Sequence, residues 1–120
     1  MNKYLEQLLE IEGIAKNEPA TLLKEDKAMC NGRLILSGKR LVFICNGCEE
    51  PELDIDLDTI NSIKHESHFV DNNILAITYL QYEAARFTVI NTSDWENAIE
   101  EQRMTPHIEV EPVFTLKSLN

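Results

Sequence analysis

Two cysteines and two histidines have the spacing of a zinc site. Cys45 and Cys48 enclose two residues, and His65 and His68 follow after sixteen more. Thiolates and imidazoles are preferred zinc ligands, and two close pairs permit a tetrahedral arrangement. A second interpretation competes with this one, because Asn46-Gly47 is also a preferred hairpin-turn pair. On that interpretation the four side chains are unpaired thiols and surface histidines, so the zinc site is an alternative hypothesis.

The cysteines give no sign of redox or nucleophilic chemistry. A thioredoxin-type pair needs the first turn of a helix to lower the thiol pKa, whereas Cys45 and Cys48 lie in a predicted turn. Cys30 is expected to be a small buried residue. An odd number of cysteines, without a secretory signal, predicts reduced thiols in the cytoplasm. No local signature indicates a catalytic residue or a cofactor, so we expect a non-enzymatic protein.

Three aspartates alternate with apolar residues between Leu53 and Asp58. A calcium loop beginning at Asp54 needs glycine at its sixth position and glutamate at its twelfth, where this chain has Thr59 and His65. The alternation instead predicts a half-buried strand with its carboxylates about 7 Å apart on one face. This acidic face consists of Asp54, Asp56 and Asp58, and we predict that it recognises a basic partner.

The composition is that of one soluble domain with a strong acidic bias. Its 120 residues are 43% hydrophobic and 27% charged, and the formal net charge is −10. An acidic surface repels nucleic-acid phosphates and anionic lipid headgroups, so nucleic acid is not an expected partner. No stretch approaches the roughly 18 consecutive apolar residues of a membrane span. These features predict a cytoplasmic domain that binds protein.

The two ends of the chain differ from its centre. Apolar residues spaced by three and four predict an amphipathic helix over Met1–Lys16, and Pro19 prevents its continuation. A second helix is expected to start at Ser93, with Trp95 plugging one end of a barrel. We therefore divide the chain into an N-terminal helical segment (1–20), a central domain (21–103) and a C-terminal tail (104–120).

The central domain has the two-residue period of strands. Gly38 is expected in a type II′ turn and Asn46-Gly47 in a type I′ turn, while Gly32 falls between two predicted strands. The predicted strands are Thr21–Cys30, Arg33–Ser37, Leu41–Cys45, Glu52–Leu57, Ile60–Glu66, Asn73–Leu80 and Ala85–Ile90.

Parts of this pattern resemble the bacterial pleckstrin-homology and GRAM-like domains. The resemblance rests on Gly32-Arg-Leu-Ile-Leu, on Arg40-Leu-Val-Phe, and on the run from Leu53 to Ile60 followed by Ser62-Ile63. It extends over residues 21–102 and implies a mainly β fold. The implied fold is a pleckstrin-homology-like barrel of two roughly orthogonal antiparallel sheets, with about seven strands, a C-terminal capping helix and an extra N-terminal helix. The family implies binding of lipids, peptides or a second copy.

Protein contacts, including self-association, are the predicted function. The candidate surfaces are the first helix (Tyr4, Leu5, Leu8 and Ile11), the acidic face, and the tail (Ile108, Val110 and Phe114). The alternative is binding of a phosphoinositide or another anionic lipid by Lys24, Lys27, Arg33, Lys39 and Arg40. Lipid-binding members of the family continue this basic pattern, whereas Leu34 and Ile35 end it here and Glu25 and Asp26 interrupt it. Lipid is therefore the second choice.

Overall fold

Residues 2–25, 27–67 and 73–104 are described by the computed structural model, and they form seven strands and two α-helices. In chain order the elements are α1 (Lys3–Glu12), β1 (Ile14–Lys24), β2 (Lys27–Ser37), β3 (Arg40–Cys45), β4 (Leu53–Asp56), the 3₁₀ helix η1 (Leu57–Thr59), β5 (Ile60–Glu66), β6 (Ile74–Tyr79), β7 (Glu83–Thr88) and α2 (Thr92–Met104). The predicted mainly β fold with a helix at each end is confirmed.

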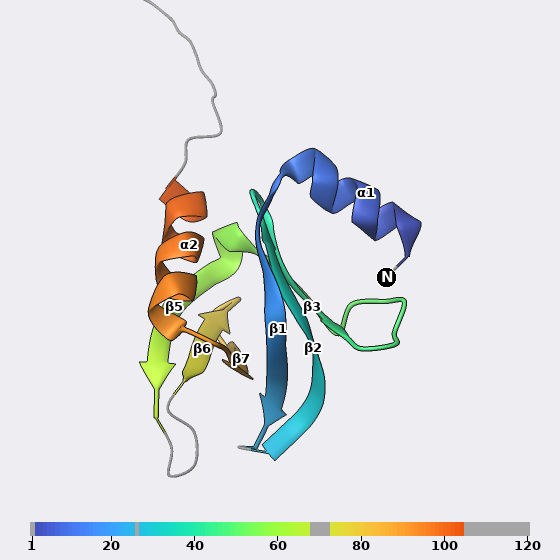
Figure 1. Cartoon of the computed structure of the whole chain (residues 1–120). Coiled ribbons are helices and arrows are strands. Elements are labelled where there is room, and N and C mark those ends of the chain that lie inside the picture. Colours follow the sequence, from blue (N-terminus) through green and yellow to red (C-terminus); the bar gives the residue numbers. More distant parts are fainter. Residues whose placement is uncertain (1, 26, 68–72, 105–120) are drawn as a thin grey trace, which may run out of the picture.

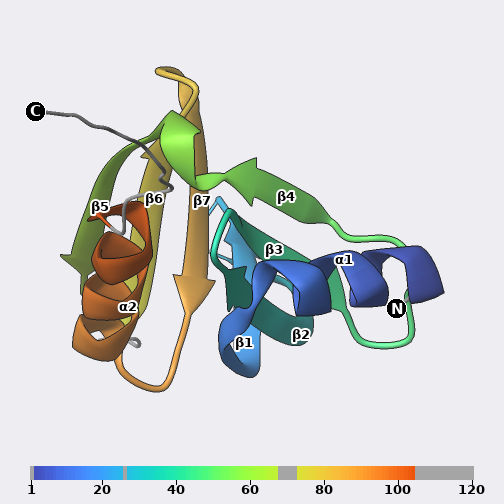
Figure 2. The same cartoon turned by 90° about the horizontal axis from the view of Figure 1, so that it is seen from above.

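All seven strands join one antiparallel sheet in the order β4-β3-β2-β1-β7-β6-β5. β1 links its two halves, because it pairs with β2 from Ile14 to Lys24 and with β7 at Thr21–Leu23. Figures 1 and 2 show β1–β4 as one layer and β5–β7 as the other. α2 lies beside the second layer, and α1 lies on the far side of the first. The two expected sheets are thus two layers of one continuous sheet, which is not closed.

The main core lies between the two layers. Phe43 on β3 and Phe87 on β7 are fully buried, and their ring centres lie 5.5 Å apart. Full burial of a side chain of this size contributes about 1.5–3 kcal/mol. Trp95 and Ile99 of α2 are fully buried in the same cluster. Trp95 is therefore a core residue of the capping helix, as the sequence predicted.

α1 is shorter than predicted, and the first strand begins earlier. Gly13 has φ +87° and its N–H donates to carbonyls of the last helical turn, so α1 ends at Glu12 and not at Lys16. β1 then begins at Ile14 and contains Pro19. A proline is tolerated there because this half of β1 has a strand partner on one side only.

Three of the expected turns differ in position or type. The chain reverses between β1 and β2 next to Glu25, whose φ is +53°, so β2 continues through Gly32 where a turn was expected. Gly38 does lie in the turn between β2 and β3, but its φ is not positive, so the turn is not of type II′. Gly47 has φ +82° and Asn46 does not have a positive φ, which excludes type I′.

α1 packs on the outer face of the first layer. Its Leu5 and Leu9 are buried against Ile35 of β2 and Val42 of β3, in a cluster separate from the main core. Asn2 caps the helix, since its Oδ1 accepts a hydrogen bond from the Leu5 N–H at 2.7 Å. The Asn2 N–H also donates to a carbonyl of the loop between β3 and β4 at 3.1 Å. The N-terminal end of α1 is thereby fixed to the sheet.

An ion pair fixes the C-terminal end of α1. The Glu12 carboxylate accepts hydrogen bonds from Arg40 Nε and Nη2 at 3.0 and 2.9 Å, and from Ser37 Oγ at 2.7 Å. The Glu12 side chain is only 5% exposed. Burial raises the pKa of Glu12, but the hydrogen bonds from Arg40 and Ser37 outweigh burial, so the pKa lies below its ordinary value of 4.5.

We expect Glu12→Gln to lower the free energy of unfolding by about 2 kcal/mol at neutral pH, because Arg40 loses its charged acceptor. Since folding lowers the pKa of Glu12, its contribution is complete above pH 4.5 and disappears as the pH falls below that value. The variant and the wild type should therefore converge in acid. Urea unfolding across this pH range measures the difference, with the exposed Glu10→Gln as control. A penalty that does not depend on pH would contradict this account.

Candidate functional site

Two hairpin turns of the sheet lie at one end of the molecule, which we call the open end. The pairs Lys24–Lys27 and Tyr79–Glu83 close the β1–β2 and β6–β7 hairpins, and the antiparallel pairing of β1 with β7 brings the end of β1 beside the start of β7. A cavity of about 280 Å³ opens there. Its lining includes the apolar residues Leu23, Met29, Leu53 and Tyr79 and the charged residues Lys24, Glu52 and Glu83. The cavity wall is therefore mixed, with apolar side chains and charges next to one another.

The turn between β6 and β7 projects two apolar side chains beside this cavity. Leu80 is 58% exposed and Tyr82 is 91% exposed. Leu80 and Gln81 have φ of +50° and +71°, which side chains larger than glycine rarely adopt. Hydrogen bonds hold this conformation, because Leu80 N donates to the Thr59 carbonyl at 2.9 Å and Gln81 N donates to Asn61 Oδ1 at 2.6 Å. Residues other than glycine with positive φ are often found at binding and catalytic sites.

Carboxylates outnumber cations around the open end among the described residues. Glu25, Glu52 and Glu83 are exposed there, against exposed Lys24 and Lys27. Burial raises the pKa of Tyr79 in the cavity wall, and the charge of Glu83 raises it further. The Tyr79 hydroxyl is therefore a neutral hydrogen-bonding group at physiological pH. The open end combines exposed apolar side chains with a net acidic border. It therefore suits a ligand that carries an apolar side chain next to positive charge.

The five basic residues of the lipid hypothesis do not converge. Lys24 and Lys27 lie at the open end, whereas Lys39 and Arg40 lie at the turn between β2 and β3 at the opposite end of β2. Arg40 is paired with Glu12 and also with Asp54, at 3.0 Å. Arg33, in the middle of β2, donates from Nε to Asn17 Oδ1 at 2.7 Å. These residues do not form one cationic site.

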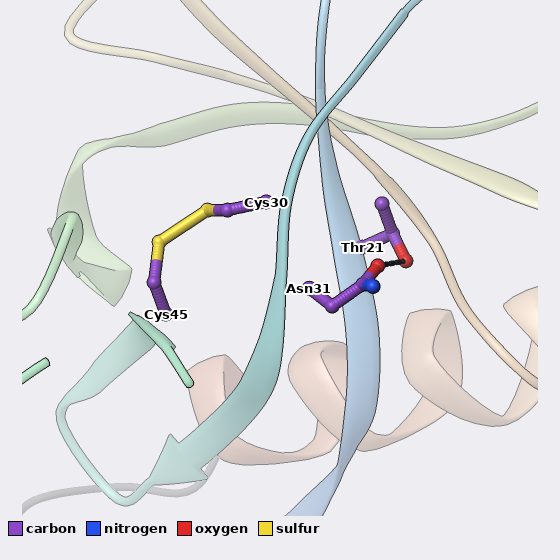
Figure 3. Close-up of a disulfide and its surroundings, with 4 residues drawn as sticks. All are labelled: Thr21, Cys30, Asn31 and Cys45. Carbon is purple, nitrogen blue, oxygen red and sulfur yellow. Dashed lines mark hydrogen bonds between the residues drawn. A yellow bond between two sulfur atoms is a disulfide. The ribbon is translucent and has the colours of Figure 1, made fainter. Parts of the chain in front are cut away.

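The four candidate zinc ligands are not available as a set. Cys45 forms a disulfide with Cys30, and their Cα atoms lie 6.0 Å apart (Figure 3). Cys48 is an exposed free cysteine, and His65 lies on β5. His68 lies outside the described residues. The residues that the structure describes contain no group of three or more metal-binding side chains.

The disulfide corrects the interpretation of the cysteines. Cys30 and Cys45 come from β2 and β3, whose register places Gly32 opposite Cys45. Beside them, Thr21 Oγ1 and Asn31 Oδ1 lie 2.7 Å apart and link β1 to β2 (Figure 3). The expectation that all three thiols are reduced is therefore wrong for this pair, and location in the cytoplasm stays a prediction.

The acidic face is less acidic than its sequence suggests. Asp54 on β4 is paired with Arg40, and Asp58 lies in η1, where the strand alternation has ended. Asp56 and Asp58 line a groove of about 330 Å³ together with Lys39 and Arg103. Cations thus border each of the three aspartates, and all three remain exposed.

The candidate partner residues of α1 divide into two groups. Leu5 is buried against the sheet, while Tyr4 and Ile11 are 76% and 82% exposed and Leu8 is half-buried. The candidate tail residues, Ile108, Val110 and Phe114, lie outside the described residues.

Sequence reasoning did not identify the open end as a site. Leu80 ends one predicted strand, Gln81 and Tyr82 lie between it and the next, and this segment contains no glycine, asparagine or proline. Apolar residues in a hairpin turn without the usual turn residues were the available signal. The position of this turn beside the cavity depends on the pairing of distant strands, which the sequence does not show.

Comparison with known proteins gives structural matches and no sequence matches, since no family model and no curated protein matches the chain. The C-terminal domain of an unknown protein from Leishmania infantum has a TM-score of 0.69 and 14% identity, over 82% of this chain and 91% of that one. The Vps36 N-terminal PH domain has a TM-score of 0.59 and 16% identity, over 80% and 85%. The Slm1-PH domain in complex with phosphoserine has a TM-score of 0.56 and 9% identity, over 74% and 91%.

This chain has a PH-like fold. The strand order, the capping α2 and the matched PH domains agree on this point. Because the sequence identities are low, the structural matches support a shared fold and nothing further. The bacterial and GRAM-like parts of the resemblance therefore stay predictions. No helix in the described part of this PH-like chain has the length and apolar character needed to cross a membrane.

Proposed function

We propose that this PH-like chain is a non-enzymatic binding module that acts through protein contacts at its open end. The observation that carries the proposal is the β6–β7 turn, in which Leu80 and Gln81 have positive φ and Leu80 and Tyr82 are exposed, beside a cavity with apolar and charged walls. Exposed aromatic residues next to a pocket are the usual anchors of protein interfaces. Self-association is a second kind of protein contact in this proposal, away from the open end, and α1 offers Tyr4 and Ile11 for it.

The chemistry of the open end favours a particular class of partner. An apolar side chain of a peptide segment fits the space bordered by Met29 and Tyr79, and lysine or arginine beside it would meet Glu52 and Glu83. An anionic lipid headgroup would meet the same carboxylates, with Lys24 and Lys27 as the nearby described cations. The Slm1-PH neighbour is a complex with phosphoserine, but the net acidic border of this site favours a basic partner.

The test uses synthetic peptides in which one tryptophan, phenylalanine or leucine is flanked by lysine and arginine. We expect one or more of them to bind the wild type, and Tyr82→Ser to raise the dissociation constant by about 10- to 30-fold, because the anchor is lost. Fluorescence polarisation measures this. Tyr4→Ser is the matched control, since it removes another highly exposed tyrosine, from α1.

Two outcomes would overturn this function. One is that no peptide of this class binds, or that Tyr4→Ser weakens binding as much as Tyr82→Ser. The other is sedimentation with phosphatidylserine vesicles that is lost in a Lys24→Ala and Lys27→Ala double variant. That second result would identify the open end as a lipid-binding surface.

A further inference from the structure

We infer that α1 is a self-association surface on which two copies of this chain pair their first helices in antiparallel orientation. This inference rests on the proposed function, because it assigns one of the protein contacts to a specific surface and a specific partner. The surface is the stripe of Tyr4, Leu8 and Ile11, which we call the α1 stripe. It lies on a different element from the open end, so the two sites can be tested separately.

The α1 stripe follows from helix geometry and burial. Successive residues of an α-helix turn by about 100°, so positions 4, 8 and 11 fall on one line along the helix. Leu5 and Leu9 lie about a quarter turn away and are buried against the sheet. Tyr4 and Ile11 are mostly exposed, and Leu8 is half-buried between the two faces. The sheet of the same chain therefore uses one apolar face of α1 and leaves the adjacent one uncovered.

α1 is also held rigidly enough to serve as a docking surface. Asn2 fixes its first turn to the loop between β3 and β4, and Glu12 fixes its last turn to Ser37 and Arg40. Pairing two such helices does not require either of them to fold on contact, so it avoids most of the ordering cost of binding. The exposed apolar side chains are thus presented in a fixed arrangement.

The charges beside the stripe indicate that the partner is a second copy. Lys3 and Glu10 are exposed, seven residues apart, and therefore on the same flank of the stripe. In an antiparallel pair, residues on equivalent flanks meet, so Lys3 of one copy lies opposite Glu10 of the other, and this happens twice. Tyr4 then packs near Ile11 of the second copy, with Leu8 near the two-fold axis. Antiparallel helix dipoles add to this preference.

The size of the contact sets its strength. Three apolar side chains from each copy make an interface well below the ~1,200 Å² of ordinary stable complexes. The net charge of −10 on each copy also opposes association. We therefore expect a reversible dimer that is populated at high protein concentration or where another contact holds two copies together.

Sedimentation equilibrium of the full chain over a wide concentration range tests the inference. We expect a monomer–dimer equilibrium whose dissociation constant rises at least about tenfold in Tyr4→Ser with Ile11→Ser, since two exposed side chains no longer become buried. Tyr82→Ser is the matched control and should leave the equilibrium unchanged. Circular dichroism checks that each variant retains its fold.

The orientation has its own test. Lys3→Glu and Glu10→Lys should each weaken the dimer several-fold, and the combined variant should restore it, because the opposite charges face each other again. In a Cys48→Ser background, a mixture of Tyr4→Cys and Ile11→Cys chains should form a mixed disulfide dimer on mild oxidation, more readily than either chain alone. Preferential cross-linking between two Tyr4→Cys chains, or between two Ile11→Cys chains, would exclude the antiparallel arrangement.

A monomer at every concentration, or a dimer that the α1 variants do not affect, would overturn this inference. Peptide binding at the open end would then still support the proposed function. The reverse result, with an α1-dependent dimer and no peptide binding, would overturn the open-end site and leave self-association as the protein contact.

Discussion

Trp95→Ala is expected to lower the free energy of unfolding by about 3–5 kcal/mol, because it leaves a large cavity between α2 and the sheet. The Trp95 side chain is fully buried at the centre of the main core. Lys16 Nζ of β1 lies 5.2 Å from the centre of its ring, so the indole also contacts the strand that links the two layers. Urea unfolding followed by circular dichroism measures the loss.

Trp95→Phe is the informative control for this prediction. Trp95 Nε1 is buried and forms no hydrogen bond with a described residue, so replacing the indole with a phenyl ring breaks no hydrogen bond. The smaller ring still fills most of the space, and we expect a loss of only about 1 kcal/mol. An equal loss of stability in Trp95→Phe and Trp95→Ala would contradict the view that Trp95 stabilises the protein by filling the core with an aromatic ring.

Much of the fold could be predicted because its strands alternate clearly. Leu53, Ile55 and Leu57 alternate with aspartates, and Ile55 and Leu57 are buried as that pattern requires. The start of α2 was predicted within one residue. Its cap is Asn91, however, whose Oδ1 accepts the Asp94 N–H at 3.1 Å, whereas Ser93 lies inside the helix. The period of the pattern indicates the type of an element more securely than it indicates the residue at its end.

The β1–β2 turn could not be placed because the two-residue period continues across it. Strand-like residues lie on both sides of Lys24-Glu-Asp-Lys27, and this segment lacks the usual turn residues glycine and asparagine. The disulfide was missed for a related reason. Cys30 and Cys45 are 15 residues apart and meet only when β2 and β3 pair in the observed register. The open end depends on the same pairing, so its residues were not predicted as a site.

The two apolar faces of α1 show a different limit of sequence reasoning. The sequence places Leu5 and Leu9 on one line and Tyr4, Leu8 and Ile11 on the next, and nothing in the helix itself says which line is buried. In the observed orientation Leu5 and Leu9 face the sheet and the Glu12 carboxylate reaches Arg40, so the ion pair stabilises this orientation. A long-range ion pair therefore contributes, together with burial of Leu5 and Leu9, to the choice of the exposed face.

Gly32→Ala is expected to destabilise the protein by about 3 kcal/mol or more. A Cβ at position 32 would collide with the Ile44 carbonyl oxygen of β3 and would lie 2.9 Å from the Cys45 Cα. Both are backbone positions of the neighbouring strand and cannot move without disturbing the pairing of β2 with β3. Gly32 has no positive φ, so its glycine is required for close strand approach and not for a turn.

Gly47→Ala is the matched control for Gly32→Ala. A Cβ at Gly47 meets no atom within 4 Å, and only its φ of +82° disfavours alanine, which costs about 1–2 kcal/mol. Urea unfolding of both variants separates crowding from backbone conformation. Equal losses would mean that β2 and β3 can separate at Gly32 at a cost no larger than that of an unfavourable φ. The close approach of these strands would then not fix the register that joins Cys30 to Cys45 and sets the start of the β3–β4 loop.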